Sequence, residues 1–167
     1  MKKFLPLLTI LLIAAIVAIV FISLSKKEKM ITIQKGNIQK LPLKIEKGHV
    51  NDTECKMIIT DTTYAAEAVA PNGDTWFFDD PGCMIKWLKG KPFEKEAKLW
   101  VKAVDTKKWI DAKKAWYSLT DPTPMHYGFG AREVKKDGYI NFEEMRLKML
   151  RGENMSDPRI RKRLLGL

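Results

Sequence analysis

Two sulfur side chains, Cys55 and Met57, lie one residue apart in the sequence Glu54-Cys55-Lys56-Met57. If this segment is an extended strand, residues i and i+2 project from the same face, so the thiolate and the thioether would point in one direction. Both are soft ligands and suit a soft cation such as Cu(I). The pair predicts a Cu(I) site, although Met57 taken alone is more typical of a core methionine.

A second pair of donors, Met125 and His126, lies in a loop rich in proline and glycine at 121–130. Cu(I) accepts thiolate, thioether and imidazole ligands at low coordination numbers, and one thiolate would neutralise its charge. The predicted ligands of Cu(I) are therefore Cys55, Met57, Met125 and His126. The alternatives are that Met125 fills a gap in the loop and that His126 is a surface residue. His49 is also interpreted as a surface residue, with a role as a fourth ligand as the alternative.

Cys55 and Cys83 are the only cysteines, too few for a disulfide scaffold or a four-cysteine zinc site. Cys83 is interpreted as a core residue, with a third soft ligand or a redox partner of Cys55 as alternatives. Outside the cytoplasm a pair of thiols tends to oxidise. A metal-free interaction module with a Cys55–Cys83 disulfide is therefore the competing hypothesis.

The adjacent carboxylates Asp79 and Asp80 precede Pro81-Gly82, which is typical of the start of a helix. Helix capping accounts for at least one of them, and a hydrolase or hard-metal site is a weaker interpretation. The chain contains no phosphate-binding glycine loop, nucleophile elbow, Cys-x-x-Cys or His-Glu-x-x-His motif. We therefore expect a protein that is not an enzyme.

The N-terminal segment predicts a membrane anchor. Met1-Lys2-Lys3 is followed by 21 uncharged residues, 4–24, which as a helix would match a hydrocarbon core of roughly 30 Å. This exceeds the apolar region of a cleavable signal peptide, although the Ser23-Leu24-Ser25 triplet leaves cleavage open. The lysines on the two sides do not decide the orientation. We expect a single-pass protein of the inner membrane with its domain in the periplasm.

The formal net charge is +10, from 30 Lys+Arg and 20 Asp+Glu. Because the lysines are scattered and no nucleic-acid-binding motif accompanies them, we expect no nucleic-acid partner. A basic surface could instead favour an acidic partner protein. The C-terminal cations, from Arg159 to Arg163, are interpreted as a frayed basic tail, with contact to anionic lipid headgroups as the alternative.

The remaining pattern predicts an α+β domain. Residues 62–70 and 75–78 are typical of two strands, and Pro71-Asn72-Gly73-Asp74 is typical of the turn of a hairpin. A helix from Pro81 and a strand at 99–104 follow. Short apolar runs and a helix capped by Asn141 then suggest that a strand-strand-helix order recurs in a second, related unit. The expected segments are an anchor at 1–25, a linker at 26–48, a copper-binding domain at 49–152 and a basic tail at 153–167.

Four motifs together resemble the NosL family of nitrous oxide reductase accessory proteins. They are Cys55-Lys56-Met57, the run Trp76-Phe77-Phe78-Asp79-Asp80-Pro81-Gly82-Cys83, Trp109-Ile110-Asp111-Ala112 with Ala115-Trp116-Tyr117, and the run Pro124-Met125-His126-Tyr127-Gly128-Phe129-Gly130-Ala131. The resemblance covers roughly residues 51–150. It implies an exported, membrane-tethered Cu(I) chaperone with two small related units of α+β structure, in which Cys55, Met57 and Met125 match the family's ligands.

The resemblance also implies partners. The copper acceptor would be nitrous oxide reductase or its maturation transporter complex. Many family members are lipoproteins, but no cysteine precedes Cys55 here, so the apolar segment would have to serve as the tether. The family's fold is similar to part of organomercurial lyase. A lyase-type enzyme is therefore a further alternative, and it would require Asp79 or Asp80 beside a reactive thiol.

Overall fold

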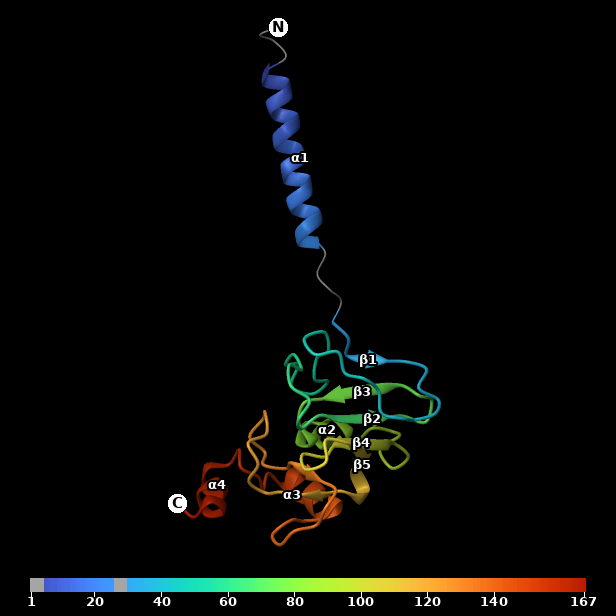
Figure 1. Cartoon of the computed structure of the whole chain (residues 1–167), viewed down its shortest axis with the longest axis vertical. Helices are drawn as coiled ribbons and strands as arrows, with labels where there is room; N and C mark the ends of the chain where they lie inside the picture. The colour runs from blue at the N-terminus through green and yellow to red at the C-terminus, as the bar shows by residue number, and fades with distance from the viewer. Residues whose placement is uncertain (1–4, 26–29) are drawn as a thin grey trace.

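The computed structural model describes residues 5–25 and 30–167. Helix α1 (Leu5–Ser25) stands apart from a packed body that contains the other elements (Figure 1). The lysines at positions 2, 3, 26, 27 and 29, which entered the prediction of membrane orientation, lie outside the described residues.

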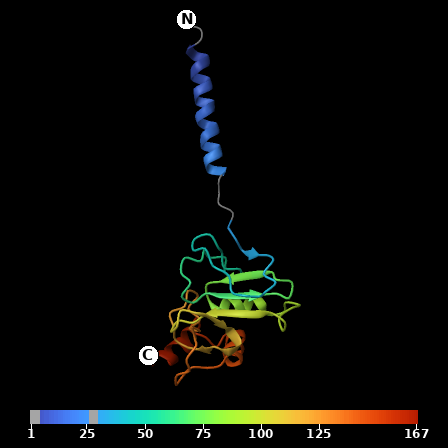
Figure 2. The same ribbon diagram turned by 45° about the vertical axis from the view of Figure 1, so that its right-hand side comes forward.

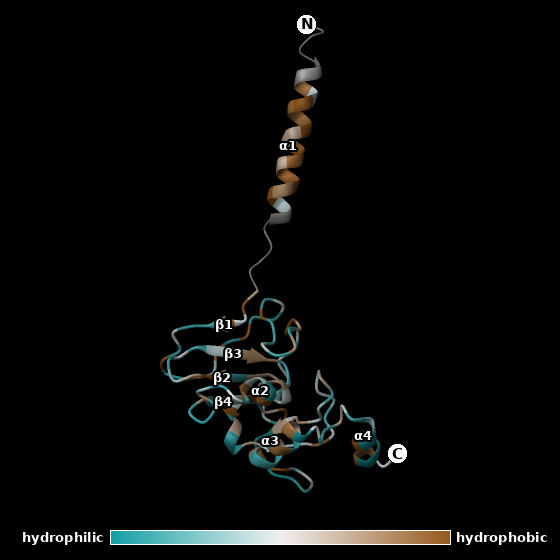
Figure 3. Cartoon of the chain, turned by 180° about the vertical axis from the view of Figure 1, so that it is seen from behind, coloured by the Kyte–Doolittle hydropathy of each residue, from teal (hydrophilic) through white to brown (hydrophobic). Residues whose placement is uncertain are grey.

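The predicted transmembrane anchor needs correction. Among residues 5–25 and 30–167, no helix has both the length and the apolar character required to cross a membrane. Helix α1 is mostly apolar (Figure 3), but it does not meet this requirement. By this criterion the anchor is wrong, and so are the single-pass inner-membrane location and the periplasmic orientation.

The body is built on one antiparallel sheet of five strands in the order β1-β3-β2-β4-β5. A separate two-stranded ribbon pairs β6 with β7. Figure 2 shows the stacked strands of the main sheet edge-on. The strands are β1 (Ile33–Gln34), β2 (Ala66–Val69), β3 (Thr75–Phe78), β4 (Lys98–Lys102), β5 (Trp109–Asp111), β6 (Trp116–Tyr117) and β7 (Ala131–Arg132).

The hairpin that the sequence predicts is confirmed. Strands β2 and β3 pair from Ala66 opposite Phe78 to Val69 opposite Thr75. The turn closes with the Ala70 N–H donating to the Asp74 carbonyl at 2.8 Å, and Gly73 takes the positive φ of 83° that favours glycine. This hairpin ends beside Asp79, so it fixes one wall of the site described below.

One helix packs directly on one face of the sheet, and a second helix packs against the first. Helix α2 (Pro81–Leu88) begins at the Asp80 cap, and α3 (Phe142–Arg151) has an Asn141–Glu144 capping box and ends at Gly152 with a φ of 74°. The main core lies between these helices and the sheet. A smaller core on the opposite face includes Ile45, Val50, Ile59, Ala65 and Phe77. The remaining elements are the 3-10 turn η1 (Ala112–Lys114) and α4 (Pro158–Leu165).

The predicted pair of related units is also wrong. The first unit exists as β2-β3-α2-β4, but β5 joins the same sheet beside β4. The second set of strands is reduced to the two-residue ribbon β6-β7. The body is a mixed αβ fold around one sheet, because the residues of β5 pair with Trp100–Lys102 instead of starting a sheet of their own.

Candidate metal centre

Four side chains from three segments of the chain converge at one edge of the body. Asp52, Cys55, Asp79 and Cys83 bring one ligand atom each to within 4.8 Å of one another. Asp52 and Cys55 belong to a turn, Asp79 follows β3, and Cys83 lies in the first turn of α2. Thiolate and carboxylate are both metal ligands, so this cluster could hold a metal ion.

Asp52 positions the turn that carries Cys55. Its Oδ1 accepts hydrogen bonds from the backbone N–H of Glu54 at 2.7 Å and of Cys55 at 2.9 Å. Its Oδ2 accepts from the Asp79 N–H at 2.9 Å. Three of the roughly four lone-pair sites of this carboxylate are therefore used by the backbone. Asp52 orients Cys55 and Asp79 toward each other and has little capacity left for a metal ion.

Asp80 performs the corresponding task on the other side of the cluster. Its Oδ1 accepts from the Gly82 N–H at 2.8 Å and caps α2, which places Cys83 third in the helix. Its Oδ2 accepts from the Met125 N–H at 3.2 Å and ties the 121–130 loop to the start of α2. One buried carboxylate therefore fixes both the helix that carries Cys83 and the loop that carries Met125.

Burial raises the pKa of both thiols and of Asp79. Burial raises the pKa of the Cys55 thiol to about 11, and the charges of Asp52 and Asp79 add to the rise. Burial raises the pKa of the Cys83 thiol still further. Burial and a hydrogen bond with Asp52 raise the pKa of Asp79 to about 8. A bound cation would reverse this balance, because a coordinating thiol loses its proton.

The cluster is accessible from one side. Asp52 and Cys83 are fully buried and Asp79 is 5% exposed, whereas Cys55 is half-buried. Both cysteines are free thiols. The Cys55 sulfur lies 4.0 Å from the Asp79 Oδ1. A metal ion or an incoming ligand would therefore meet Cys55 first and Cys83 last.

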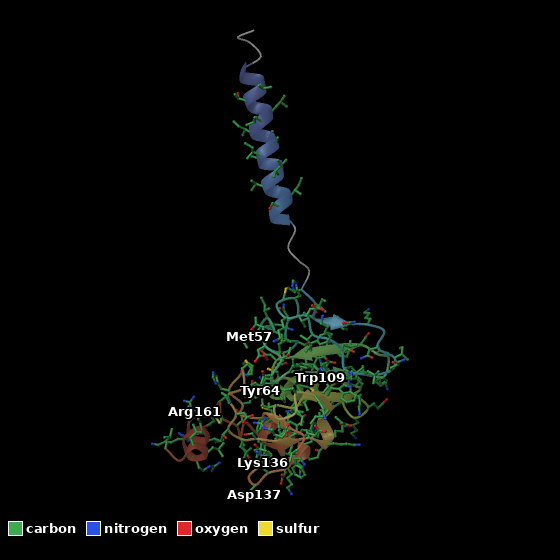
Figure 4. All side chains as sticks on the ribbon, in the orientation of Figure 1. Met57, Tyr64, Trp109, Lys136, Asp137 and Arg161 are labelled. Carbon is green, nitrogen blue, oxygen red and sulfur yellow. The ribbon has the colours of Figure 1, made fainter. Side chains whose placement is uncertain are left out.

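The strand geometry assumed for Cys55 and Met57 is wrong. Cys55 lies in a turn, Lys56 has a positive φ of 67°, and the Asp52 N–H donates to the Met57 carbonyl at 2.8 Å. The two side chains are therefore not related by the alternation of a strand. Met57 is 41% exposed and lies at the periphery of the body (Figure 4). Its role as a ligand stays a prediction.

The second predicted pair occupies the loop that Asp80 holds. Met125 is half-buried and packs against the main core, as Cys55 does. His126 is exposed, has a positive φ of 56° and donates its N–H to the Thr123 carbonyl at 2.8 Å. The backbone of Met125 is therefore fixed near α2, while the His126 side chain faces solvent. Their assignment as ligands also stays a prediction.

Sequence reasoning missed Asp52 and kept Cys83 only as an alternative ligand. The sequence analysis assigned no role to Asp52, although aspartate side chains commonly stabilise turns by accepting hydrogen bonds from nearby backbone N–H groups. Cys83 was interpreted as core, although its place three residues after the Asp80 cap puts it in the first turn of α2. Asp79 and Asp80 have separate roles, since Asp80 caps the helix and Asp79 faces the thiols.

In comparisons with known proteins, the chain matched no protein family and no curated protein. The geometry itself defines a class. The chain is a mixed αβ protein with a buried cluster of two thiols and two carboxylates that could hold a metal ion.

Proposed function

We propose that this chain is a Cu(I) chaperone that binds the ion between Cys55 and Cys83 and passes it to a copper-requiring protein. The observation that carries the proposal is the approach of two free thiols, whose sulfur atoms lie within 4.8 Å. Two thiolates suit a soft monovalent ion at a low coordination number. Asp79 is the third donor in reach, since Asp52 is engaged by the backbone.

The surroundings favour Cu(I) over Zn²⁺. A structural zinc site is closed by four strong ligands, and here Asp52 is already occupied by three N–H groups. Thioether ligands select Cu(I), and Met57 and Met125 lie in the two segments that flank the cluster. The half-buried position of Cys55 supports delivery, because an acceptor ligand can approach that sulfur while Cys83 still holds the ion.

The proposed acceptor follows from the resemblance of the sequence to the NosL family. Nitrous oxide reductase, or the transporter complex that matures it, is the expected client. Incubating the Cu(I)-loaded chain with copper-free nitrous oxide reductase, separating the two and measuring copper in each tests this directly. Copper that stays on the chain, while the reductase accepts it from another Cu(I) source, would exclude this client.

The binding site is tested with the full chain under anaerobic conditions. Cu(I) is titrated in competition with a chromophoric chelator, using the wild type, Cys55→Ser and Met145→Leu. Met145 is a buried sulfur residue of α3, so its variant controls for a general loss of sulfur from the core. We expect one Cu(I) per chain and a roughly hundredfold loss of affinity in Cys55→Ser alone. Unchanged affinity in Cys55→Ser would contradict the proposal.

Counting thiols separates the chaperone from the metal-free interaction module. The module predicts a Cys55–Cys83 disulfide in the isolated protein, hence no reactive thiol after unfolding. The chaperone predicts two. Unfolding the native protein in denaturant with a thiol reagent, without reductant, gives this number directly.

A second candidate function is favoured by a specific contact. The Asp79 carboxyl, with a pKa raised to about 8, lies 4.0 Å from the Cys55 sulfur and close to Cys83. This provides the proximity of a carboxyl and two thiols that a lyase-type enzyme acting on a carbon–mercury bond would require. The two thiols would bind mercury as thiolates and release their protons to solvent. As the Hg–C bond breaks, the Asp79 proton would go to the departing carbon, and external thiolates would then remove Hg²⁺ from the two cysteines. Release of benzene from phenylmercuric acetate tests it, with Asp79→Asn as the control variant.

A further inference from the structure

The C-terminal segment forms a defined helix and not a frayed tail. The Asp157 side chain caps α4 by accepting from the N–H of Arg159 at 2.8 Å and of Ile160 at 3.2 Å. Gly166 ends the helix with a φ of 69°. At eight residues an isolated helix would be marginal, so the attachment of α4 to the body matters.

Helix α4 is attached through a short buried segment. Asn154 and Met155 are 3% and 8% exposed, and the Asn154 Oδ1 accepts from the Ser156 N–H at 3.0 Å. The Met155 N–H donates to the Tyr127 carbonyl at 3.3 Å. Tyr127 belongs to the loop that holds Met125 against Asp80. The base of α4 is therefore joined by hydrogen bonds to the loop beside the metal centre.

The charges of α4 are unbalanced. The helix carries Arg159, Arg161, Lys162 and Arg163 and no acidic residue. Within residues 5–25 and 30–167, no ion pair neutralises these four side chains. At about 100° per residue, Arg159, Lys162 and Arg163 fall on one arc of roughly 100°. This arc is a cationic face on a helix that buries none of its residues.

The apolar side of α4 is turned toward its own domain. Ile160 and Leu164, four residues apart, are half-buried, and Leu164 lines a cavity together with Leu119 and Tyr139. Leu165 remains exposed. A helix that lies on a bilayer must offer its whole apolar face to the lipid. The outward face of α4 is instead cationic. A cationic face complements an acidic protein surface better than a membrane.

Helix α4 and the metal centre are both connected to the 121–130 loop, through Met155 and Asp80 respectively. Figure 1 shows α4 projecting beside the segment around residues 120–130, and Figure 3 shows the same relation from behind. Resting on the proposed function, we propose that α4 is a docking helix that binds an acidic surface on the protein exchanging Cu(I) with the Cys55–Cys83 centre. Its cationic face would orient that partner toward the 121–130 loop and the accessible side of Cys55.

The test uses the full, metal-free chain and a fluorescent poly-L-glutamate as an acidic probe. The docking variant combines Arg159→Glu, Lys162→Glu and Arg163→Glu. The matched control combines Lys35→Glu, Lys95→Glu and Lys107→Glu, which changes the net charge equally at exposed lysines outside α4. A third variant has glutamine at the three α4 positions, which removes the charge without reversing it. It keeps the test decisive if the docking variant misfolds.

At about 50 mM salt we expect probe affinity to fall about tenfold in the docking variant, about threefold in the glutamine variant and less than about threefold in the control. Equal losses in the docking and control variants would overturn the proposal. So would α4-dependent binding to phosphatidylglycerol vesicles that exceeds binding to poly-L-glutamate. Because the probe is tested without metal, this result is independent of the Cu(I) titration, in which the docking variant should match the wild type.

Discussion

Two buried carboxylates, Asp79 and Glu67, have similar acidity but very different neighbours. Burial raises the pKa of each to about 8. Glu67 lies in β2 between Ala66 and Ala68, which face the main core, so its side chain points to the opposite face of the sheet. There both of its oxygens accept from one group, the Leu43 N–H, at 3.0 Å and 3.3 Å.

The difference between these acids separates a structural group from a candidate site. Asp79 has two thiols and a second carboxylate within 4.8 Å. Glu67 has one backbone N–H and lies beside the small core that includes Ile45 and Phe77. Burial alone therefore shifts a pKa without creating a site. Binding a cation requires several donors that converge, and only the Asp79 region provides them among the described residues.

The largest effect should come from removing either thiol. We expect Cys55→Ser and Cys83→Ala each to lower Cu(I) affinity roughly a hundredfold, because one thiolate cannot replace two. The double variant should bind little more weakly than each single variant, since both remove the same bidentate unit. Glu67→Gln should leave the affinity unchanged. Additive losses of Cu(I) affinity in the double variant would show that the thiols act separately. They would contradict the view that the donors around Asp79, unlike Glu67, form one site.

Glu67 should control stability instead. Its pKa in the folded protein lies above its ordinary value of 4.5, so the folded state keeps a proton that the unfolded state loses. The contribution of Glu67 to the free energy of unfolding is then fully present below about pH 4.5 and falls as the pH rises toward 8. Glu67→Gln should abolish this fall in the free energy of unfolding, which is on the order of 3 kcal/mol between pH 5 and pH 8. Urea unfolding at both pH values measures it.

The exposed Glu96→Gln variant is the matched control for Glu67→Gln. It should keep the wild-type dependence of stability on pH. If the stability of Glu67→Gln depends on pH in the same way as that of Glu96→Gln, the buried carboxylate contributes nothing to the pH dependence of stability.

Asp79 should affect the pH dependence of metal binding. Below its pKa of about 8 the carboxyl is protonated, so a metal ion that uses it must displace that proton as well as those of the two thiols. Between pH 6 and pH 8, each pH unit should therefore increase the Cu(I) affinity of the wild type about tenfold more than it increases the Cu(I) affinity of Asp79→Asn. Parallel curves in a Cu(I) competition titration would exclude Asp79 as a ligand.

Met57 should give the smallest effect. Its side chain is 41% exposed and its segment is a turn, so any contact with the ion is weakly fixed. We expect Met57→Leu to reduce Cu(I) affinity by no more than about threefold, and Met125→Leu to reduce it more, because the Asp80 carboxylate holds the Met125 backbone. Cu(I) competition at one pH compares the two. A larger loss in Met57→Leu would reverse this ranking.

Local elements could be predicted where a short motif determines the backbone. The hairpin at 66–78 was predictable because Asn72-Gly73 supplies the turn, and α2 and α3 because Asp80 and Asn141 are strong caps. The arrangement of strands was not. Whether Trp109–Asp111 starts a second sheet or joins the first depends on pairing with β4, which no local pattern encodes.

The candidate site could be predicted only in part, because it also depends on contacts between distant segments of the chain. Cys55 stood out by its residue type, but its neighbours depend on which segments the fold brings together. Asp52 reaches the Asp79 N–H across 27 residues of sequence, and Asp80 reaches Met125 across 45. The assumed strand at Cys55–Met57 failed because the Asp52 cap and the positive φ of Lys56 produce a turn.

The double attachment of Asp80 sets limits for engineering this protein. Since one carboxylate serves both the first turn of α2 and the Met125 backbone, the helix and the loop cannot be adjusted separately at that position. Met125 itself contributes only its N–H to this attachment. Variants such as Met125→His and Met125→Cys would therefore keep the hydrogen bond that ties the loop to the start of α2.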